Sequence, residues 1–192
     1  RTPGHEHRLI CGDCTDAAVV ERVMGGENAT LAPVDPPYNV GFDYDGATVD
    51  DAKSIEAFEK FSRAWFTVCQ SVSERQIVTP GCNNLAWWCR WFDPYHWGTW
   101  TKTNALSPGR VSHFWVWEPV FFHGKGWKRD RGSDLFNYPI GKQPDTFNHP
   151  CPKPIKMWQD LIDNYSEPGD VIYEAFNGSG TTIIAAENLS RQ

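Results

Sequence analysis

The sequence lacks any apolar run near the ~20 residues that a membrane-spanning helix needs, and it shows no signal-peptide pattern. We therefore expect no membrane association and a reducing cytoplasm as the compartment. The six cysteines include one close pair, Cys11 and Cys14, but no second pair of similar spacing, because Cys82 and Cys89 lie farther apart. Since a structural zinc site needs two such pairs, we predict no metal. A chain of 192 residues rich in core-forming side chains also needs no disulfide framework.

The chain also lacks an overall positive charge, since 24 acidic residues face 18 basic ones and the net charge is −6. This excludes a protein that binds nucleic acid over its whole surface. The charge is uneven, however, and residues 123–156 carry seven basic against three acidic side chains. Such a segment can contact phosphates. Our candidates for DNA contacts are Lys125, Lys128, Arg129, Arg131 and Lys142.

The length is that of one domain, and the hydrophobic pattern alternates between strands and helices. We expect strands at residues 7–11, 30–34, 77–79, 97–101, 114–122 and 171–176, and helices at residues 16–24, 54–73, 84–92, 154–165 and 181–189. Residues 123–148 have no clear period and are interpreted as a long loop. The alternation predicts an α/β fold with a mostly parallel sheet and helices on both faces. The 10 Trp and 11 Phe are unusually many, and aromatic-rich surfaces often stack on flat ligands.

Two distinctive turns follow two of these strands. Asp35-Pro36-Pro37-Tyr38 ends the apolar run 31–34, because proline has no amide hydrogen for a central ladder. Asn177-Gly178-Ser179-Gly180 follows residues 171–176 and precedes a helix. Ligands of open α/β sheets bind at the carboxyl ends of the strands. The sequence therefore predicts that the two turns share one crevice.

The glycine turn alone is ambiguous, because a glycine turn after a strand is often only a connection. It has no third glycine at the spacing of a dinucleotide fingerprint and no acidic residue about 20 positions later, which argues against a nicotinamide-dependent oxidoreductase. It also lacks the lysine of a phosphate-gripping loop.

Five segments in a fixed order give the chain a family resemblance over nearly its whole length: "HRLICGDCTD", "VDPPYNVGF", "WEPVFFHGKG", "HPCPKPIKMWQDLI" and "PGDVIYEAFNGSGTTIIAAENL". In this order they resemble a DNA amino-methyltransferase of the permuted (β) class, whose Asp-Pro-Pro-Tyr motif precedes the glycine turn. The resemblance implies a Rossmann-like fold with circularly permuted motif order, S-adenosylmethionine as cofactor, DNA as partner, and a monomer or homodimer.

The resemblance also implies how the first turn works. The carboxylate of Asp35 and the carbonyl of Pro36 would accept the two hydrogens of an exocyclic amino group, and Pro37 would help to hold that carbonyl rigidly. Tyr38 would stack on a base flipped out of the duplex. Asp-Pro-Pro-Tyr favours adenine N6, and cytosine N4 is the alternative.

For the cofactor, the resemblance assigns Asp35 and three further groups of residues. The first is the glycine-turn region, with Glu174, Phe176, Asn177, Gly178, Ser179, Gly180 and Thr181. The second is "HPCPKP", with His149, Lys153 and Pro154 near the methionine moiety, although a proline-rich helix entry is the other reading. The third is Asp13, which equally fits a helix cap. Glu118 fits either a position beside the site or an exposed strand position.

The chain departs from the family at two points. It has Glu174-Ala175-Phe176 where the family usually has Asp-Pro-Phe, and it stops at Gln192, before the strand whose acidic residue holds the ribose. The expected arrangement is one domain over residues 1–192 with a short basic target-recognition segment at about 123–148. We expect a DNA methylase of a bacterial or phage-like restriction-modification context. The alternatives are a methyltransferase for another amine or amide, and a DNA-binding domain without turnover.

Overall fold

The computed structural model describes residues 6–41, 51–105, 113–127, 132–141 and 153–192. At its centre is a five-stranded sheet in the order β1-β2-β4-β3-β5. The strands are β1 (Ala32–Val34), β2 (Arg75–Val78), β3 (His96–Lys102), β4 (Trp117–Gly124) and β5 (Leu135–Tyr138). Because β4 is antiparallel to both of its neighbours and the other pairs are parallel, the other four strands share one direction.

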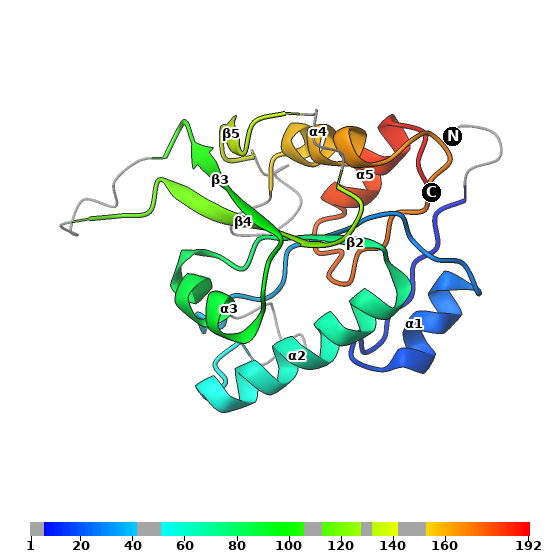
Figure 1. Cartoon of the computed structure of the whole chain (residues 1–192), viewed down its shortest axis with the longest axis horizontal. Coiled ribbons are helices and arrows are strands. Elements are labelled where there is room, and N and C mark those ends of the chain that lie inside the picture. Colours follow the sequence, from blue (N-terminus) through cyan, green and yellow to red (C-terminus); the bar gives the residue numbers. More distant parts are fainter. Residues whose placement is uncertain (1–5, 42–50, 106–112, 128–131, 142–152) are drawn as a thin grey trace.

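Helices cover both faces of this sheet, as expected (Figure 1). One face carries α1 (Ala17–Met24), α2 (Ile55–Val72) and α3 (Leu85–Trp91), the last preceded by the short 3₁₀ helix η1 (Cys82–Asn84). The other carries α4 (Ile155–Tyr165) and α5 (Thr181–Asn188). The α1 helix begins at Asp16, whose side chain accepts a hydrogen bond from the amide of Ala18, and ends at Gly25 in the left-handed conformation.

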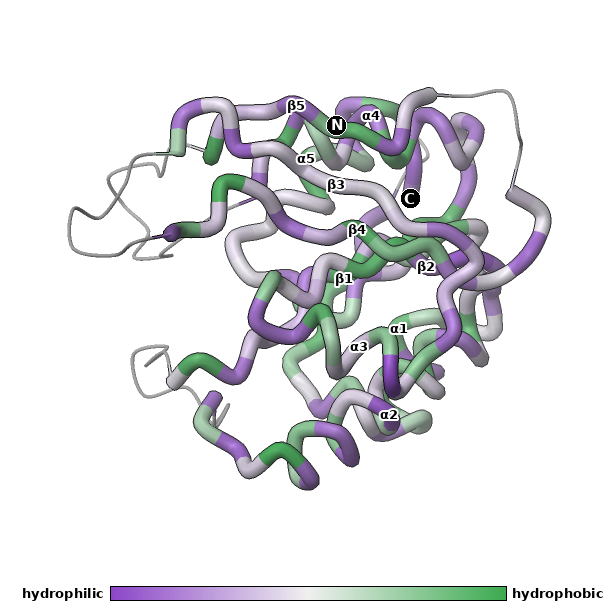
Figure 2. Tube along the Cα trace, turned by 60° about the vertical axis from the view of Figure 1, so that its left-hand side comes forward, coloured by the Kyte–Doolittle hydropathy of each residue, from purple (hydrophilic) through white to green (hydrophobic). Residues whose placement is uncertain are grey.

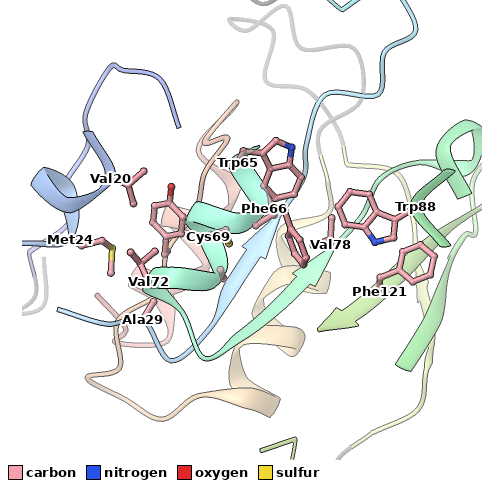
Figure 3. Packing of buried hydrophobic residues seen from close by; sticks show 13 residues of the cluster. Val20, Met24, Ala29, Trp65, Phe66, Cys69, Val72, Val78, Trp88 and Phe121 are labelled. Atoms are coloured by element: carbon pink, nitrogen blue, oxygen red, sulfur yellow. The ribbon is translucent and has the colours of Figure 1, made fainter. Parts of the chain in front are cut away.

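Two hydrophobic clusters lie against the sheet. The cluster beneath α1 to α3 centres on Trp65, Phe66, Trp88 and Phe121 (Figure 3), and the cluster beneath α4 and α5 includes Trp100 and Trp158. The rings of Trp65 and Trp88 stack at 5.9 Å. Where β2 and β4 pass through the middle of the sheet, their trace is largely green, the colour of hydrophobic residues (Figure 2). Much of the unusual aromatic content thus forms the core rather than a ligand-stacking surface.

Three expectations for individual elements were wrong. Residues 7–11 form no strand, because they are mostly exposed and no described strand pairs with them. Residues 171–176 make only a parallel bridge, between Ile172 and Leu31. The expected loop 123–148 contains β5, which pairs with β3. Phe136 is the only buried residue of this four-residue strand, so its sequence carried almost no alternating signal.

None of the helices in the described part of the chain is long and apolar enough to cross a membrane.

Candidate active site

The two turns singled out in the sequence lie at the same edge of the fold. Leu31 bridges Ile172 in parallel, and the amide of Tyr173 donates to the carbonyl of Leu31. Asp35 and Phe176 each lie four residues beyond this bridge, so the register brings the strand ends together. The charges of Asp35 and Lys153 also contribute to the pKa of Glu174. The two turns therefore lie at the same end of neighbouring segments, and their shared crevice stays a prediction.

One oxygen of Asp35 is anchored by three donors. Thr79 Oγ1 and Lys153 Nζ each donate to Oδ1 at 2.8 Å, and the Tyr38 hydroxyl donates to the same oxygen at 2.9 Å. Thr79 and Lys153 are buried, so these donors come from a rigid wall. Within the described part of the chain no group donates to Oδ2 of Asp35. The carboxylate is thus fixed in orientation and keeps one oxygen as an available acceptor.

A second acceptor lies next in sequence. The carbonyl oxygen of Pro36 receives no hydrogen bond from any described residue, although Pro36 is buried. Proline at positions 36 and 37 fixes φ at both residues, which limits how far this carbonyl can rotate. Asp35 and Pro36 therefore leave two acceptors without donors on consecutive residues, one for each hydrogen of an amino group.

The ring of Tyr38 is held by a glycine and an asparagine. Gly81 has φ +77°, and a Cβ on it would lie 2.9 Å from Cδ2 of the Tyr38 ring. Only glycine meets both conditions at this position. Asn84 Nδ2 donates to the backbone carbonyl of Tyr38 at 2.8 Å, which fixes the turn from the side of η1.

The hydroxyl of Tyr38 lies among charged groups. It contacts Asp35 and Glu118 Oε2 at 2.9 Å each and also bonds Lys153 Nζ. Burial first, and then the charges of the two carboxylates, raise the pKa of Tyr38 well above its usual value. The phenol is therefore neutral at physiological pH. It can donate one hydrogen bond and serve as a flat, uncharged ring.

The glycine turn leaves polar groups without partners. Oδ1 of Asn177 is buried and has no hydrogen-bond partner among the described residues. No side chain caps α5, whose N-cap is Gly180 at φ 77°. Exposed amides at a helix N-terminus favour an anionic group, and a buried carbonyl oxygen favours a donor. The turn thus suits a ligand that carries both a carboxylate and hydrogen-bond donors.

Glu174 supports the backbone of this turn. Its carboxylate accepts from the amide of Phe176 at 2.9 Å and from Thr182 Oγ1 at 2.8 Å. Burial raises its pKa from 4.5 to about 8, a rise that these two hydrogen bonds oppose and the charge of Asp35 increases. The longer side chain in place of the family's aspartate therefore reaches the turn and holds it.

A pocket of about 160 Å³ adjoins the glycine turn. It lies between the segment that contains Gly12 and Cys14 and the segment that contains Tyr173, Glu174 and Asn177. Asp13, which precedes Cys14, binds Thr15 through its side chain, while Asp16 caps α1. The helix-cap reading of Asp13 is therefore wrong, and its cofactor role stays a prediction.

Comparison with known proteins decides the family. A family model described as a DNA methylase of the N6/N4 type matches residues 93–192, more than half of the chain. The chain belongs to the N6/N4 DNA methylase family. The matched part includes Glu118, Lys153 and the glycine turn. The predicted family and fold are confirmed.

Two related proteins also match the part of the chain before residue 93, which contains the first turn. YubD of Escherichia coli (strain K12) is 27% identical over 96% of this chain and 82% of its own length. The type II methyltransferase M.HpaI of Haemophilus parainfluenzae is 22% identical over 97% of this chain and 68% of its own.

Solved structures of methyltransferases share the fold. The cytosine-N4-specific PvuII DNA methyltransferase has a TM-score of 0.68 at 16% identity, covering 94% of this chain and 78% of its own. The M1.HpyAVI complex with S-adenosylmethionine has a TM-score of 0.63 at 17% identity, covering 96% and 90%.

The residues predicted to contact DNA are not found beside the two turns in the described part of the chain. Lys125 follows Gly124, which pairs with Arg75 at the start of β2, so it lies at the opposite end of the sheet from Asp35. The structure therefore does not bring Lys125 to the site. Lys128, Arg129, Arg131, Lys142 and the cofactor candidate His149 lie outside the described residues.

The structure also places four further residues in or beside the site. Lys153, expected beside the cofactor, bonds Asp35 and Tyr38, while Pro154 is the N-cap of α4, in keeping with a helix entry. Glu118 is 5% exposed and lies in the site, so its reading as an exposed strand position is wrong. Thr79 was missed, because a threonine at the end of an apolar strand carries no distinctive signal.

Proposed function

We propose that this chain transfers a methyl group from S-adenosylmethionine to the exocyclic amino group of a DNA base, with adenine N6 as the preferred target. The observation that carries the proposal is the pair of acceptors at the first turn. Oδ2 of Asp35 and the carbonyl of Pro36 belong to consecutive residues, and neither receives a hydrogen bond from the described residues.

These acceptors address the chemical difficulty of the reaction. The lone pair of an exocyclic amino nitrogen is delocalised into the ring, so the nitrogen is a weak nucleophile. Hydrogen bonds from its two N–H groups to Asp35 and Pro36 draw the nitrogen toward tetrahedral geometry and orient the lone pair. Because both acceptors are fixed before the base arrives, little reorganisation is needed. Attack by the amino nitrogen itself needs no cysteine nucleophile, and burial raises the pKa of the Cys82 thiol near the site to about 12.

The cofactor supplies an electrophilic methyl group on a sulfonium. The glycine turn fits such a ligand, whose ammonium and hydroxyl groups are donors and whose carboxylate is an anion. Asn177 would accept from a donor, the amides that begin α5 would face the carboxylate, and Glu174 would hold the turn. The placement of both turns beyond the Leu31–Ile172 bridge supports direct transfer.

A flipped base needs a surface to stack on, and the site offers aromatic rings. The Tyr38 ring is fixed beside Asp35, and Phe114 and Trp115 are exposed just before β4, at the same edge of the sheet. Stacking and a neutral phenol suit an extrahelical base. Lys128, Arg129, Arg131 and Lys142, which lie outside the described residues, remain our candidates for phosphate contacts.

Labelled methyl transfer tests this proposal. The chain is incubated with methyl-labelled S-adenosylmethionine and a mixed-sequence duplex, and the DNA is hydrolysed to nucleosides. N6-methyladenine is the expected product. N4-methylcytosine would support the family's other chemistry and reject the preference for adenine. Cofactor and DNA binding without labelled nucleoside would instead favour a binding domain without turnover.

A further inference from the structure

Glu118 connects two lysines at the active-site end of the sheet. Its Oε1 lies 2.6 Å from Lys102 Nζ, and its Oε2 lies 3.2 Å from Lys153 Nζ and 2.9 Å from the Tyr38 hydroxyl. Lys102 ends β3, and Glu118 opposes Trp100 in the β3–β4 register. All three charged side chains are at most 13% exposed.

Burying these three charges lowers the stability of the fold unless their mutual interactions compensate for the lost hydration. Buried charges lose hydration, and replacing such groups by apolar residues often leaves stability unchanged or improves it. Burial alone would raise the pKa of Glu118, but Lys153 and Lys102 outweigh it and hold the pKa below its usual value. Both ammonium groups also lie within 5.5 Å of the Trp100 ring centre. Glu118 is therefore negatively charged, and both of its lysine partners lie against the Trp100 ring.

Positive and negative side chains alternate in a chain of ion pairs that runs from Lys102 through Glu118 and Lys153 to Asp35. Lys102 and Lys153 balance Glu118 and Asp35, so the group is electrically neutral as a whole. Lys153 bonds both carboxylates, and its position between them depends on Glu118 being balanced by Lys102. Without Lys102, the full negative charge of Glu118 would compete with Asp35 for Lys153.

We propose that Lys102 and Glu118 are positioning residues that hold Lys153 and Tyr38 against Oδ1 of Asp35, so that Oδ2 faces the amino group of the base. The proposal rests on the proposed function. It assigns no bond-making step to either residue, because neither contacts Oδ2 of Asp35 or the carbonyl of Pro36 among the described residues. Their effect is on the geometry of the acceptor.

The test measures kcat and KM for Lys102→Met, Lys102→Arg and Glu118→Gln with S-adenosylmethionine and duplex DNA. For Lys102→Met and Glu118→Gln we expect kcat to fall about 10- to 100-fold, the usual penalty for misplacing a reacting group by about 1 Å. KM for both substrates should stay within about threefold, since no binding contact is removed. Lys102→Arg keeps the charge and should recover most of kcat. Should Glu118→Gln not fold, the two Lys102 variants carry the test.

Lys60→Met, an exposed lysine of α2, is the matched control and should retain wild-type kcat. A kcat within threefold of wild type for Lys102→Met would overturn the inference, as would a raised KM with unchanged kcat. Failure of Lys102→Arg to recover activity would do the same. A wild-type chain that methylates nothing would instead reject the proposed function, and the positioning role with it.

Discussion

The two turns of the candidate active site differ in how many of their side chains have hydrogen-bond partners within the protein. At the first turn, Asp35, Tyr38 and Lys153 bond one another, and buried Thr79 completes the anchor. At the glycine turn, the buried oxygen of Asn177 has no partner among the described residues and no side chain caps α5. The first turn is thus anchored by its own side chains and leaves only Oδ2 of Asp35 and the carbonyl of Pro36 open, whereas the second lacks such an anchor at Asn177.

This difference follows from the tasks proposed for the two turns. A group that stabilises a transition state must be oriented in advance, since reorganisation during the reaction raises the barrier. A ligand-binding turn instead gains affinity from groups that are poorly satisfied without the ligand. The substitutions below test whether the turns separate into turnover and binding.

Asp35→Asn should have the largest effect. The donors around Oδ1 would retain the amide oxygen there and place the amide nitrogen where Oδ2 was, so a donor would face the donor of the base. We expect kcat to fall roughly 1,000-fold, as for loss of a key preorganised group. Cofactor affinity by isothermal titration should stay within threefold. Turnover above a tenth of wild type would contradict the role of Asp35 as an acceptor for the amino group.

Glu174→Gln should change the pH dependence of stability. The pKa of the native carboxyl is raised to about 8 from 4.5, so the native state holds a proton that the unfolded state releases between these values. The stabilising contribution is complete below about pH 4.5 and is lost as the pH rises to about 8. Allowing for the partial exposure of Glu174, the loss is roughly 2 to 3 kcal/mol.

Urea unfolding at pH 5, 6.5 and 8 measures this slope. The glutamine oxygen can still accept from the amide of Phe176, and its NH2 group can donate to Thr182 Oγ1. Because glutamine does not titrate, the variant should show a flatter profile than wild type. Glu56→Gln, an exposed glutamate in the first turn of α2, is the control and should keep the wild-type slope. Identical slopes for wild type and Glu174→Gln would disprove a raised pKa.

Two substitutions of Tyr38 distinguish the contribution of its ring to kcat from that of its hydroxyl. Tyr38→Ala should lower kcat on duplex DNA, because lost stacking raises the activation free energy by about 1 to 3 kcal/mol. Tyr38→Phe keeps the ring against Gly81 but removes the hydroxyl from Asp35 and Glu118, so its loss should be smaller. Steady-state methylation of the two variants gives the comparison. Equal losses would assign the whole effect to the hydroxyl and none to stacking.

The sequence revealed the two turns because their chemistry is local. Proline after Asp35 ends a strand, and the glycines at 178 and 180 begin a helix, whatever the rest of the chain does. The long helices α2 and α4 were likewise predicted nearly to their ends, because their apolar residues repeat at helical spacing.

Features that depend on pairing between distant segments were not predictable. β5 exists because Leu135 to Tyr138 pair with β3, and its own four residues carry little pattern. Glu118 is buried because Lys102 and Lys153 meet it from other elements, 16 and 35 positions away. From sequence alone, a carboxylate between apolar residues cannot be assigned to a buried network rather than a solvent-facing strand position.

Asn177→Ala gives the smallest expected effect and separates the two turns most directly. Because its Oδ1 has no partner among the described residues, truncation removes a buried unsatisfied group, and the free energy of unfolding should not fall. The affinity for S-adenosylmethionine should weaken about tenfold, since one hydrogen bond to a charged donor would be lost. Titration calorimetry and urea unfolding measure the two quantities. If truncation lowered stability and left affinity unchanged, the glycine turn would be as complete as the first one, and the contrast between a finished catalytic turn and a ligand-completed one would fail.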